Sequence, residues 1–143
     1  MQYKKIGANH ILVRLFRGEE IMASLLKVAK EAEISFAMIQ GLGAVDEAVL
    51  GLYDVTTKEY TETALHGVFE VISLTGSLDK MDGKHYGHVH IALGTTAGKT
   101  YGGHMVSGRI SITGEIVLTL LGGEVNRIRD EELGINVWDL RKE

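Results

Sequence analysis

Apolar and polar residues recur along the chain with two different periods, which predict one helix and a series of strands. Over residues 19–33 the apolar positions repeat with the helical period of about 3.6 residues, and they are Ile21, Leu25, Val28, Ala29 and Ala32. Glu19 and Glu20 fall in the expected first turn, where acidic side chains favour the positive end of the helix dipole. This segment is the one convincing helix in the sequence.

Alternating or continuous apolar runs predict strands on both sides of this helix. They cover residues 9–16, 34–40, 44–53, 58–65, 68–74, 88–93, 100–105 and 109–121, with shorter runs at 124–129 and 137–140. Gly41-Leu42-Gly43 is expected to be a turn, the strand at 68–74 to end at Thr75-Gly76-Ser77, and residues 79–84 to be a loop. One helix with about eight strands indicates an α+β fold, a mainly antiparallel sheet with the main helix packed on it. With no repeat or linker, residues 1–143 are expected to be a single compact domain.

Composition narrows the classes of protein to which the chain can belong. It has no cysteine, which excludes disulfides and thiolate metal sites and fits a reducing compartment. It lacks a long apolar run and an apolar N-terminal segment, so we expect a cytoplasmic protein that does not cross a membrane. The formal charge of −4, with scattered basic residues, argues against autonomous binding to duplex DNA.

The histidines supply the best candidate chemistry. Four of the six lie close together in the sequence: His85, His88, His90 and His104. His88 and His90 are two residues apart on a predicted strand, so both point to the same face, where two imidazoles can close on one metal ion. His85 is assigned to a loop, and His10 and His66 to strand ends.

The length of one hairpin loop decides whether His104 joins this pair. A three-residue loop, Thr96-Ala97-Gly98 with its glycine in the left-handed conformation, would place His104 directly opposite His90. A two-residue loop would turn His104 to the other face, because a slip of one residue reverses every side chain. The preceding Gly102-Gly103 allows close backbone approach or a bulge, features that often accompany a site.

Three neutral imidazoles would leave an open coordination position on zinc, and imidazole also suits nickel, copper and iron. Glu115 is a candidate fourth ligand, orienting residue or general base, and Glu70 is a second candidate base. A glutamate on a predicted strand is more often exposed to solvent than part of a site, and this reading applies to both Glu115 and Glu70. Histidine pairs on exposed strands are also common without a metal, so the pair alone does not establish a site.

Several motifs together resemble the prokaryotic branch of the plant and prokaryote conserved (PPC) family. The central one is His88-Val89-His90-Ile91-Ala92-Leu93, followed by Gly98 and by Gly102-Gly103-His104. The others occur in the family's order: Arg14, Gly18-Glu19, Gly41-Leu42-Gly43-Ala44, Leu50-Gly51, Tyr53-Asp54, Phe69-Glu70-Val71-Ile72-Ser73-Leu74-Thr75-Gly76, Thr113-Gly114-Glu115-Ile116 and Arg127. The combination is specific, whereas each piece alone is not.

The resemblance implies an antiparallel sheet with a helix, a homotrimer, and a metal, usually zinc, on His88, His90 and His104. Plant relatives carry an AT-hook and regulate genes in the nucleus, but the hook's Arg-Gly-Arg-Pro core is absent here, as is any proline. We therefore expect a homotrimeric metal-binding protein of unassigned role, for which a regulatory function stays open, with apolar residues from Ile110 to Leu120 as candidates for the interface. Two alternatives stay open: DNA binding through the trimer surface, and a metalloenzyme that uses the open position of a three-histidine metal.

Overall fold

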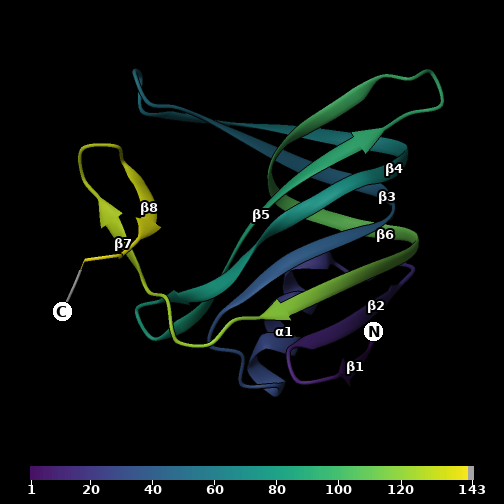
Figure 1. The fold of residues 1–143 in the computed structure, drawn as a ribbon. Helices are drawn as coiled ribbons and strands as arrows, with labels where there is room; N and C mark the ends of the chain where they lie inside the picture. The colour runs from purple at the N-terminus through teal and green to yellow at the C-terminus, as the bar shows by residue number, and fades with distance from the viewer. Residues whose placement is uncertain (142–143) are drawn as a thin grey trace.

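A strongly curved antiparallel sheet forms most of the molecule, with one short helix against it (Figure 1). The computed structural model describes residues 1–141. The elements are β1 (Gln2–Ile6), β2 (His10–Phe16), α1 (Ile21–Glu31), β3 (Ala37–Asp54), β4 (Glu59–Met81), β5 (Lys84–Gly94), β6 (Thr100–Leu120), β7 (Arg127–Asp130) and β8 (Ile135–Trp138). Six strands pair in the order β1-β2-β6-β3-β4-β5, and a further pairing of β5 with β6 closes the sheet on itself. The α+β expectation is confirmed in its broad form, with a smaller helix than the pattern suggested.

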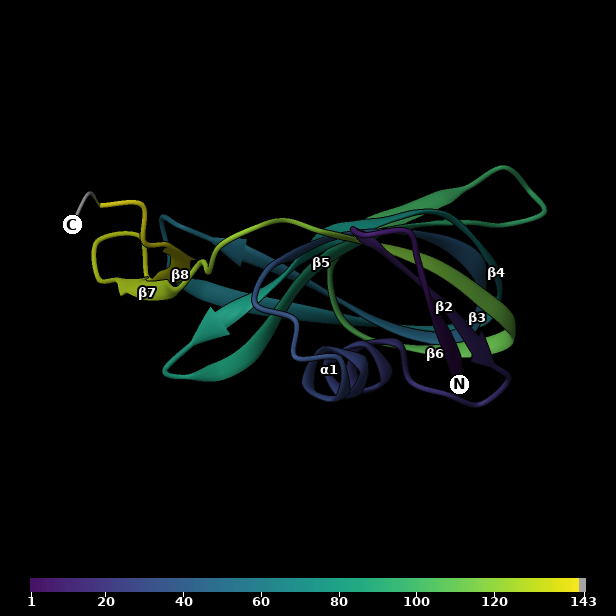
Figure 2. The same cartoon turned by 60° about the horizontal axis from the view of Figure 1, so that its bottom comes forward.

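The apolar core lies between the inner face of the sheet and one face of α1 (Figure 2). In β2 the side chains alternate strictly, with Ile11, Val13 and Leu15 buried and their neighbours exposed. The buried stripe of the helix consists of Ile21, Leu25, Val28 and Ala29. Within residues 1–141 no helix has the length and apolar character that crossing a bilayer requires.

Helix α1 begins two residues later than expected, because Glu20 caps it rather than joining its first turn. The Glu20 carboxylate accepts hydrogen bonds from the backbone N–H groups of Met22 (3.1 Å) and Ala23 (2.6 Å), and also from Gly108 on β6 (3.1 Å). Glu19 lies before the helix and pairs with the N-terminal amino group. One carboxylate thus satisfies free N–H groups of the helix and fixes the helix to the sheet.

The expected turn at Gly41-Leu42-Gly43 is wrong, since β3 runs straight through it with a bulge. The pairing of β3 with β4 shifts register between Gly41 and Gly43, and Gly43 has a φ of +153°. A Cβ on Gly43 would lie 2.3 Å from the carbonyl oxygen of Thr113 on β6. Glycine here permits close contact between neighbouring strands rather than a reversal of the chain.

The other expected breaks in the sheet are corrected in the same way. At Gly76, β4 continues, and a Cβ there would lie 2.0 Å from the backbone oxygen of His88. The expected loop at 79–84 contains a two-residue turn, Asp82-Gly83, with positive φ at both positions, which is the usual tight hairpin geometry. The segments at 58–65 and 68–74 are one strand, as are those at 100–105 and 109–121, so His66 lies inside β4. The strand β1 was not predicted; it pairs with β2.

Candidate metal centre

Three histidines converge from two neighbouring strands. His88 and His90 alternate on β5, and His104 on β6 is the direct register partner of His90. Their ring centroids are 5.1 to 5.7 Å apart, and one ring nitrogen of each lies within 4.8 Å of the other two. His85 lies on β5 rather than in a loop, and its Nε2 is 3.0 Å from the backbone oxygen of Ile34. We refer to His88, His90 and His104 as the histidine cluster.

The hairpin loop between β5 and β6 produces this convergence. The N–H of Thr95 donates to the carbonyl of Lys99 (2.9 Å), and that of Gly98 donates to the carbonyl of Thr95 (3.0 Å). Gly98 has a φ of +73°. The loop is therefore the three-residue Thr96-Ala97-Gly98 form that the sequence analysis required, and His104 shares the face of His88 and His90.

Burial keeps two of these imidazoles uncharged. It lowers the pKa of His88 to about 4, with further lowering by the nearby Arg127 guanidinium and by the other two histidines. Burial also lowers the pKa of His104, followed by the effects of His90 and Arg127. At neutral pH both rings are therefore in the unprotonated form that a metal ion needs.

The donor set fits a divalent ion that prefers nitrogen. Zinc bonds imidazole nitrogen at about 2.0–2.1 Å, so tetrahedral ligands lie about 3.4 Å apart. One ring nitrogen of each histidine lies within 4.8 Å of the other two, which is close enough for the three rings to reach this spacing by side-chain rotation. His90 is exposed and the other two rings are partly buried, so the cluster can be reached from solvent.

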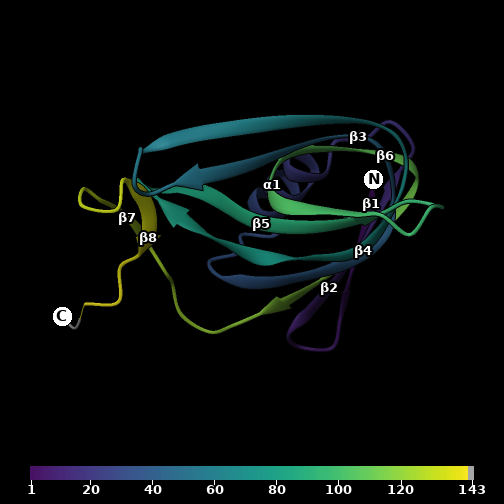
Figure 3. The same cartoon turned by 90° about the horizontal axis from the view of Figure 1, so that it is seen from above.

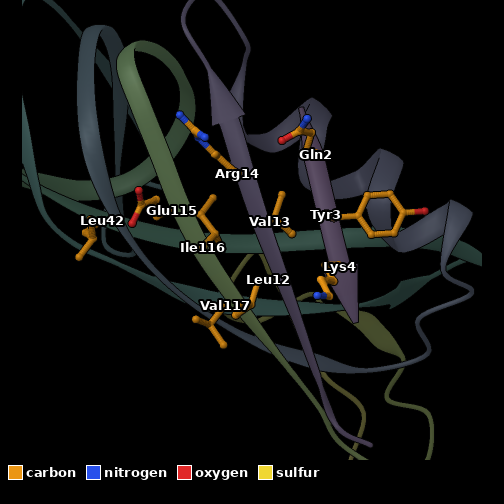
Figure 4. A pocket seen from close by; sticks show the side chains of 10 residues that line it. All are labelled: Gln2, Tyr3, Lys4, Leu12, Val13, Arg14, Leu42, Glu115, Ile116 and Val117. Carbon is orange, nitrogen blue, oxygen red and sulfur yellow. The ribbon is translucent and has the colours of Figure 1, made fainter. Parts of the chain in front are cut away.

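Neither candidate carboxylate is brought to the histidine cluster. Glu115 lies toward the far end of β6, opposite Arg14 of β2 and Leu42 of β3. It lines a separate cavity together with residues of β1 and β2 (Figure 4). Glu70 is exposed on β4, where it pairs with Ala44 and Gly94 rather than with the residues opposite the cluster. Among the described residues, the group that could hold a metal contains histidines alone.

The cluster lines a cavity of about 970 Å³ that the sequence analysis did not find. Its walls come from the tips of two hairpins that lie side by side at one end of the molecule (Figures 1 and 3). The β3–β4 hairpin contributes Tyr53, Lys58 and Tyr60, and the β7–β8 hairpin contributes Arg129 and Ile135. These residues are remote from the histidines in the sequence, and no local pattern marks them.

A buried ion pair holds the β7–β8 hairpin in this position. Arg127 Nε donates to both carboxylate oxygens of Asp79 on β4 (2.9 and 3.0 Å), and both side chains are buried. The indole N–H of Trp138 donates to the same carboxylate (2.7 Å). The Arg127 guanidinium also stacks over the ring of Tyr86, 5.0 Å from its centroid. One carboxylate thus ties β7 and β8 to the strand that neighbours His88.

Comparison with known proteins places this architecture in a family. Residues 1–122 match the family model described as the Plants and Prokaryotes Conserved (PCC) domain. A bifunctional protein GlmU from Synechococcus sp. (strain JA-2-3B'a(2-13)) is 32% identical over 108 residues, which are 74% of this chain and 16% of that protein. The chain thus corresponds to a small part of this curated relative.

Two solved structures resemble the whole chain. A provisionally named DNA-binding protein from Bacteroides thetaiotaomicron is 31% identical with a TM-score of 0.93, covering 96% of both chains. A metal-containing protein from Archaeoglobus fulgidus is 33% identical with a TM-score of 0.85, covering 96% of this chain and 98% of that one.

The low pKa of His88 predicts that the metal-free protein loses stability as the pH falls. An imidazole in the unfolded chain takes up a proton near pH 6.5, whereas His88 in the folded chain stays neutral down to about 4. Between these values the unfolded state binds more protons, so the free energy of unfolding decreases with decreasing pH. Urea unfolding of the metal-free protein at about pH 7 and about pH 5 measures the loss.

Carboxylates also take up protons toward the lower pH and contribute to the loss of stability. The readout is therefore the difference between the parent chain and a variant in the loss of unfolding free energy from about pH 7 to about pH 5. His88→Gln should lose less stability over this interval than the parent chain, because it lacks the group that stays neutral. His10→Gln, a change at an exposed histidine, should lose as much as the parent. An equal loss in His88→Gln and the parent would contradict the assignment.

Proposed function

The chain belongs to the Plants and Prokaryotes Conserved domain family, and we propose that it is a zinc-binding member with the histidine cluster as its metal site. The observation that carries the proposal is the convergence of His88, His90 and His104 on one face of two paired strands. Their donors are three nitrogens with no sulfur, which suits zinc better than the oxygen-preferring ions. The metal-containing neighbour from Archaeoglobus fulgidus supports the binding of a metal in this fold.

Each residue of the cluster has a distinct part in this proposal. His88 and His104 are partly buried and held neutral, so they form the fixed side of the site. His90 is exposed and completes the set from the solvent side. A zinc ion with three imidazole ligands keeps a position for water or another ligand, and this position would face the cavity. A binding or regulatory role fits, because the candidate metal group among the described residues consists of histidines alone, and the nearby Asp79 carboxylate is paired with Arg127.

Replacing His90 by Ala should abolish stoichiometric zinc binding, because two remaining imidazoles form a much weaker site. The change is made at an exposed position, so the fold should survive it. Elemental analysis and calorimetric zinc titration of tag-free protein give the stoichiometry. His10→Ala, which removes an exposed histidine outside the cluster, should bind as the parent does. Unchanged stoichiometry in His90→Ala would refute the assignment of the site.

We also propose a homotrimer, for which the exposed apolar residues of the sheet offer a surface. Of the candidates in β6, Ile110, Ile116 and Leu118 are buried in the chain's own core, whereas Ile112 is 67% exposed. The candidate interface is therefore narrower than the sequence suggested and centres on Ile112.

Light scattering should give a mass of three times the 15.6 kDa of the chain. Ile112→Lys should shift the mass toward the monomer, because it places a charge in an apolar contact. Leu140→Lys, at a residue that is 72% exposed but lies on the C-terminal segment, should leave the mass unchanged. A parent chain that scatters as a monomer would rule out the trimer.

DNA binding is the second candidate function, and the name of the Bacteroides thetaiotaomicron neighbour favours it. The formal charge of −4 opposes it, because phosphate contacts need clustered basic groups. If the chain acts through its metal site, fluorescence anisotropy with duplex DNA should show weak binding without steep salt dependence. Tight binding that falls steeply as salt rises would instead support phosphate contacts and the DNA-binding alternative.

A further inference from the structure

The cavity beside the histidine cluster is charged oppositely to the chain as a whole. Its lining contains Lys58 and Arg129 and, within the described residues, no carboxylate. The chain carries 19 acidic and 15 basic residues, so this local balance is not that of the average surface. Cationic groups around a partly enclosed space concentrate anions there. A divalent ion on neutral histidines would add to the same field.

Asp130 lies beside Arg129 of the lining in the sequence and Asp79 lies opposite Tyr86 of the lining in the sheet, and both carboxylates are engaged with other groups. Asp130, at the turn of the β7–β8 hairpin, accepts hydrogen bonds from the backbone N–H groups of Glu132 and Leu133. Asp79 is fully buried and paired with Arg127. Neither carboxylate lines the cavity. In the described residues, Lys58 and Arg129 have no carboxylate within ion-pair distance, so both can serve a ligand.

The remaining lining suits an apolar or flat molecular body. Aromatic rings and aliphatic side chains face the cavity from both hairpins: Leu52, Tyr53, Val55, Tyr60, Leu133 and Ile135. Several are exposed, among them Leu52 at 73% and Val55 at 54%. Exposed apolar side chains around a few polar groups are typical of small-molecule sites, and the volume of about 970 Å³ lies in the range of such cavities.

The two walls are held against each other, so the cavity is formed before any ligand enters. Gly134, at the tip of the β7–β8 hairpin, has a φ of +74°, and a Cβ there would lie 2.3 Å from the hydroxyl oxygen of Tyr53. The tips of the two hairpins are therefore in contact. The Arg127–Asp79 ion pair fixes the base of the same hairpin. Because the walls are already in place, ligand binding loses less conformational entropy than it would if the two hairpins had to be ordered.

We infer that this cavity binds a small anionic molecule with an aromatic or aliphatic body, and that Lys58 and Arg129 recognise its carboxylate or phosphate group. The inference rests on the proposed metal centre only for the place of the anionic group beside the metal, whereas the binding of the anion depends on Lys58 and Arg129. It deepens that proposal by naming the class of ligand: an organic anion rather than a neutral molecule or a cation.

The test uses the full chain loaded with Co²⁺, whose visible absorption reports binding to the histidine cluster. Phenyl phosphate and phenylacetate are titrated as anionic probes, and phenylacetamide as the neutral match of the second. Calorimetry and the cobalt absorption provide two separate readouts. Both anions should bind saturably, and phenylacetamide should bind about tenfold more weakly or not at all, since it cannot form the charge-assisted hydrogen bonds.

Two matched variants locate the anion. Arg129→Gln should weaken the binding of both anions about tenfold, the order expected for one charge-assisted hydrogen bond. It should leave the cobalt stoichiometry unchanged. Arg14→Gln removes the same charge from the cavity that Glu115 lines (Figure 4) and should bind as the parent does. Lys58→Gln provides a second variant on the other hairpin and should also weaken binding.

The outcomes separate the two proposals. If cobalt binds but the anions do not, or phenylacetamide binds equally well, or Arg129→Gln and Arg14→Gln behave alike, the anion inference is wrong and the metal centre stands. If cobalt does not bind, the proposed metal centre is wrong. Calorimetry on the metal-free chain then decides the inference by itself: anion binding that depends on Arg129 would retain it, and no binding would overturn it.

Discussion

The pairing of His90 with His104 across β5 and β6 is the constraint on which the candidate site depends. Side chains in a strand alternate between two faces, so a slip of one residue in this pairing would turn His104 away from His88 and His90. The loop Thr96-Ala97-Gly98 prevents that slip, because its length and the left-handed conformation of Gly98 set the register. The length of one short loop thus determines whether the three histidines share a face of the sheet.

The buried pair of Arg127 and Asp79 connects this cluster to the cavity beside it. Removing two charges from water is costly, and such a pair is weak evidence for stability by itself. Here it has two visible consequences. It attaches the β7–β8 hairpin to β4, which places Arg129 in the wall of the cavity. The Arg127 guanidinium also adds to the effect of burial in lowering the pKa of His88, so the same group helps to keep this candidate ligand unprotonated.

Much of the cluster could be predicted from the sequence, because its geometry is local. The two-residue spacing of His88 and His90 and the length of the following loop are both visible in the chain. Strand boundaries were harder to predict, because glycine occurs both within strands and in the turns that end them. At Gly43 and Gly76 the missing side chain allows strands to approach, whereas at Gly83 and Gly98 it allows the chain to turn.

The walls of the cavity could not be predicted, since Tyr53, Lys58 and Arg129 meet the histidines only through the closure of the sheet and the Arg127–Asp79 pair. Glu115 was a candidate ligand or base for the histidines because it follows His104 on a predicted neighbouring strand. In the structure both residues lie on β6, but Glu115 is opposite Arg14 and lines a different cavity.

Anomalous diffraction from a crystal of the tag-free protein grown with zinc tests the central claim most directly. The account predicts one strong peak at the zinc absorption edge, about 2.0–2.1 Å from a ring nitrogen of each of His88, His90 and His104. It also predicts non-protein density in the remaining position on the side of the cavity. Zinc bound elsewhere, or an empty cluster in zinc-saturated crystals, would contradict the account.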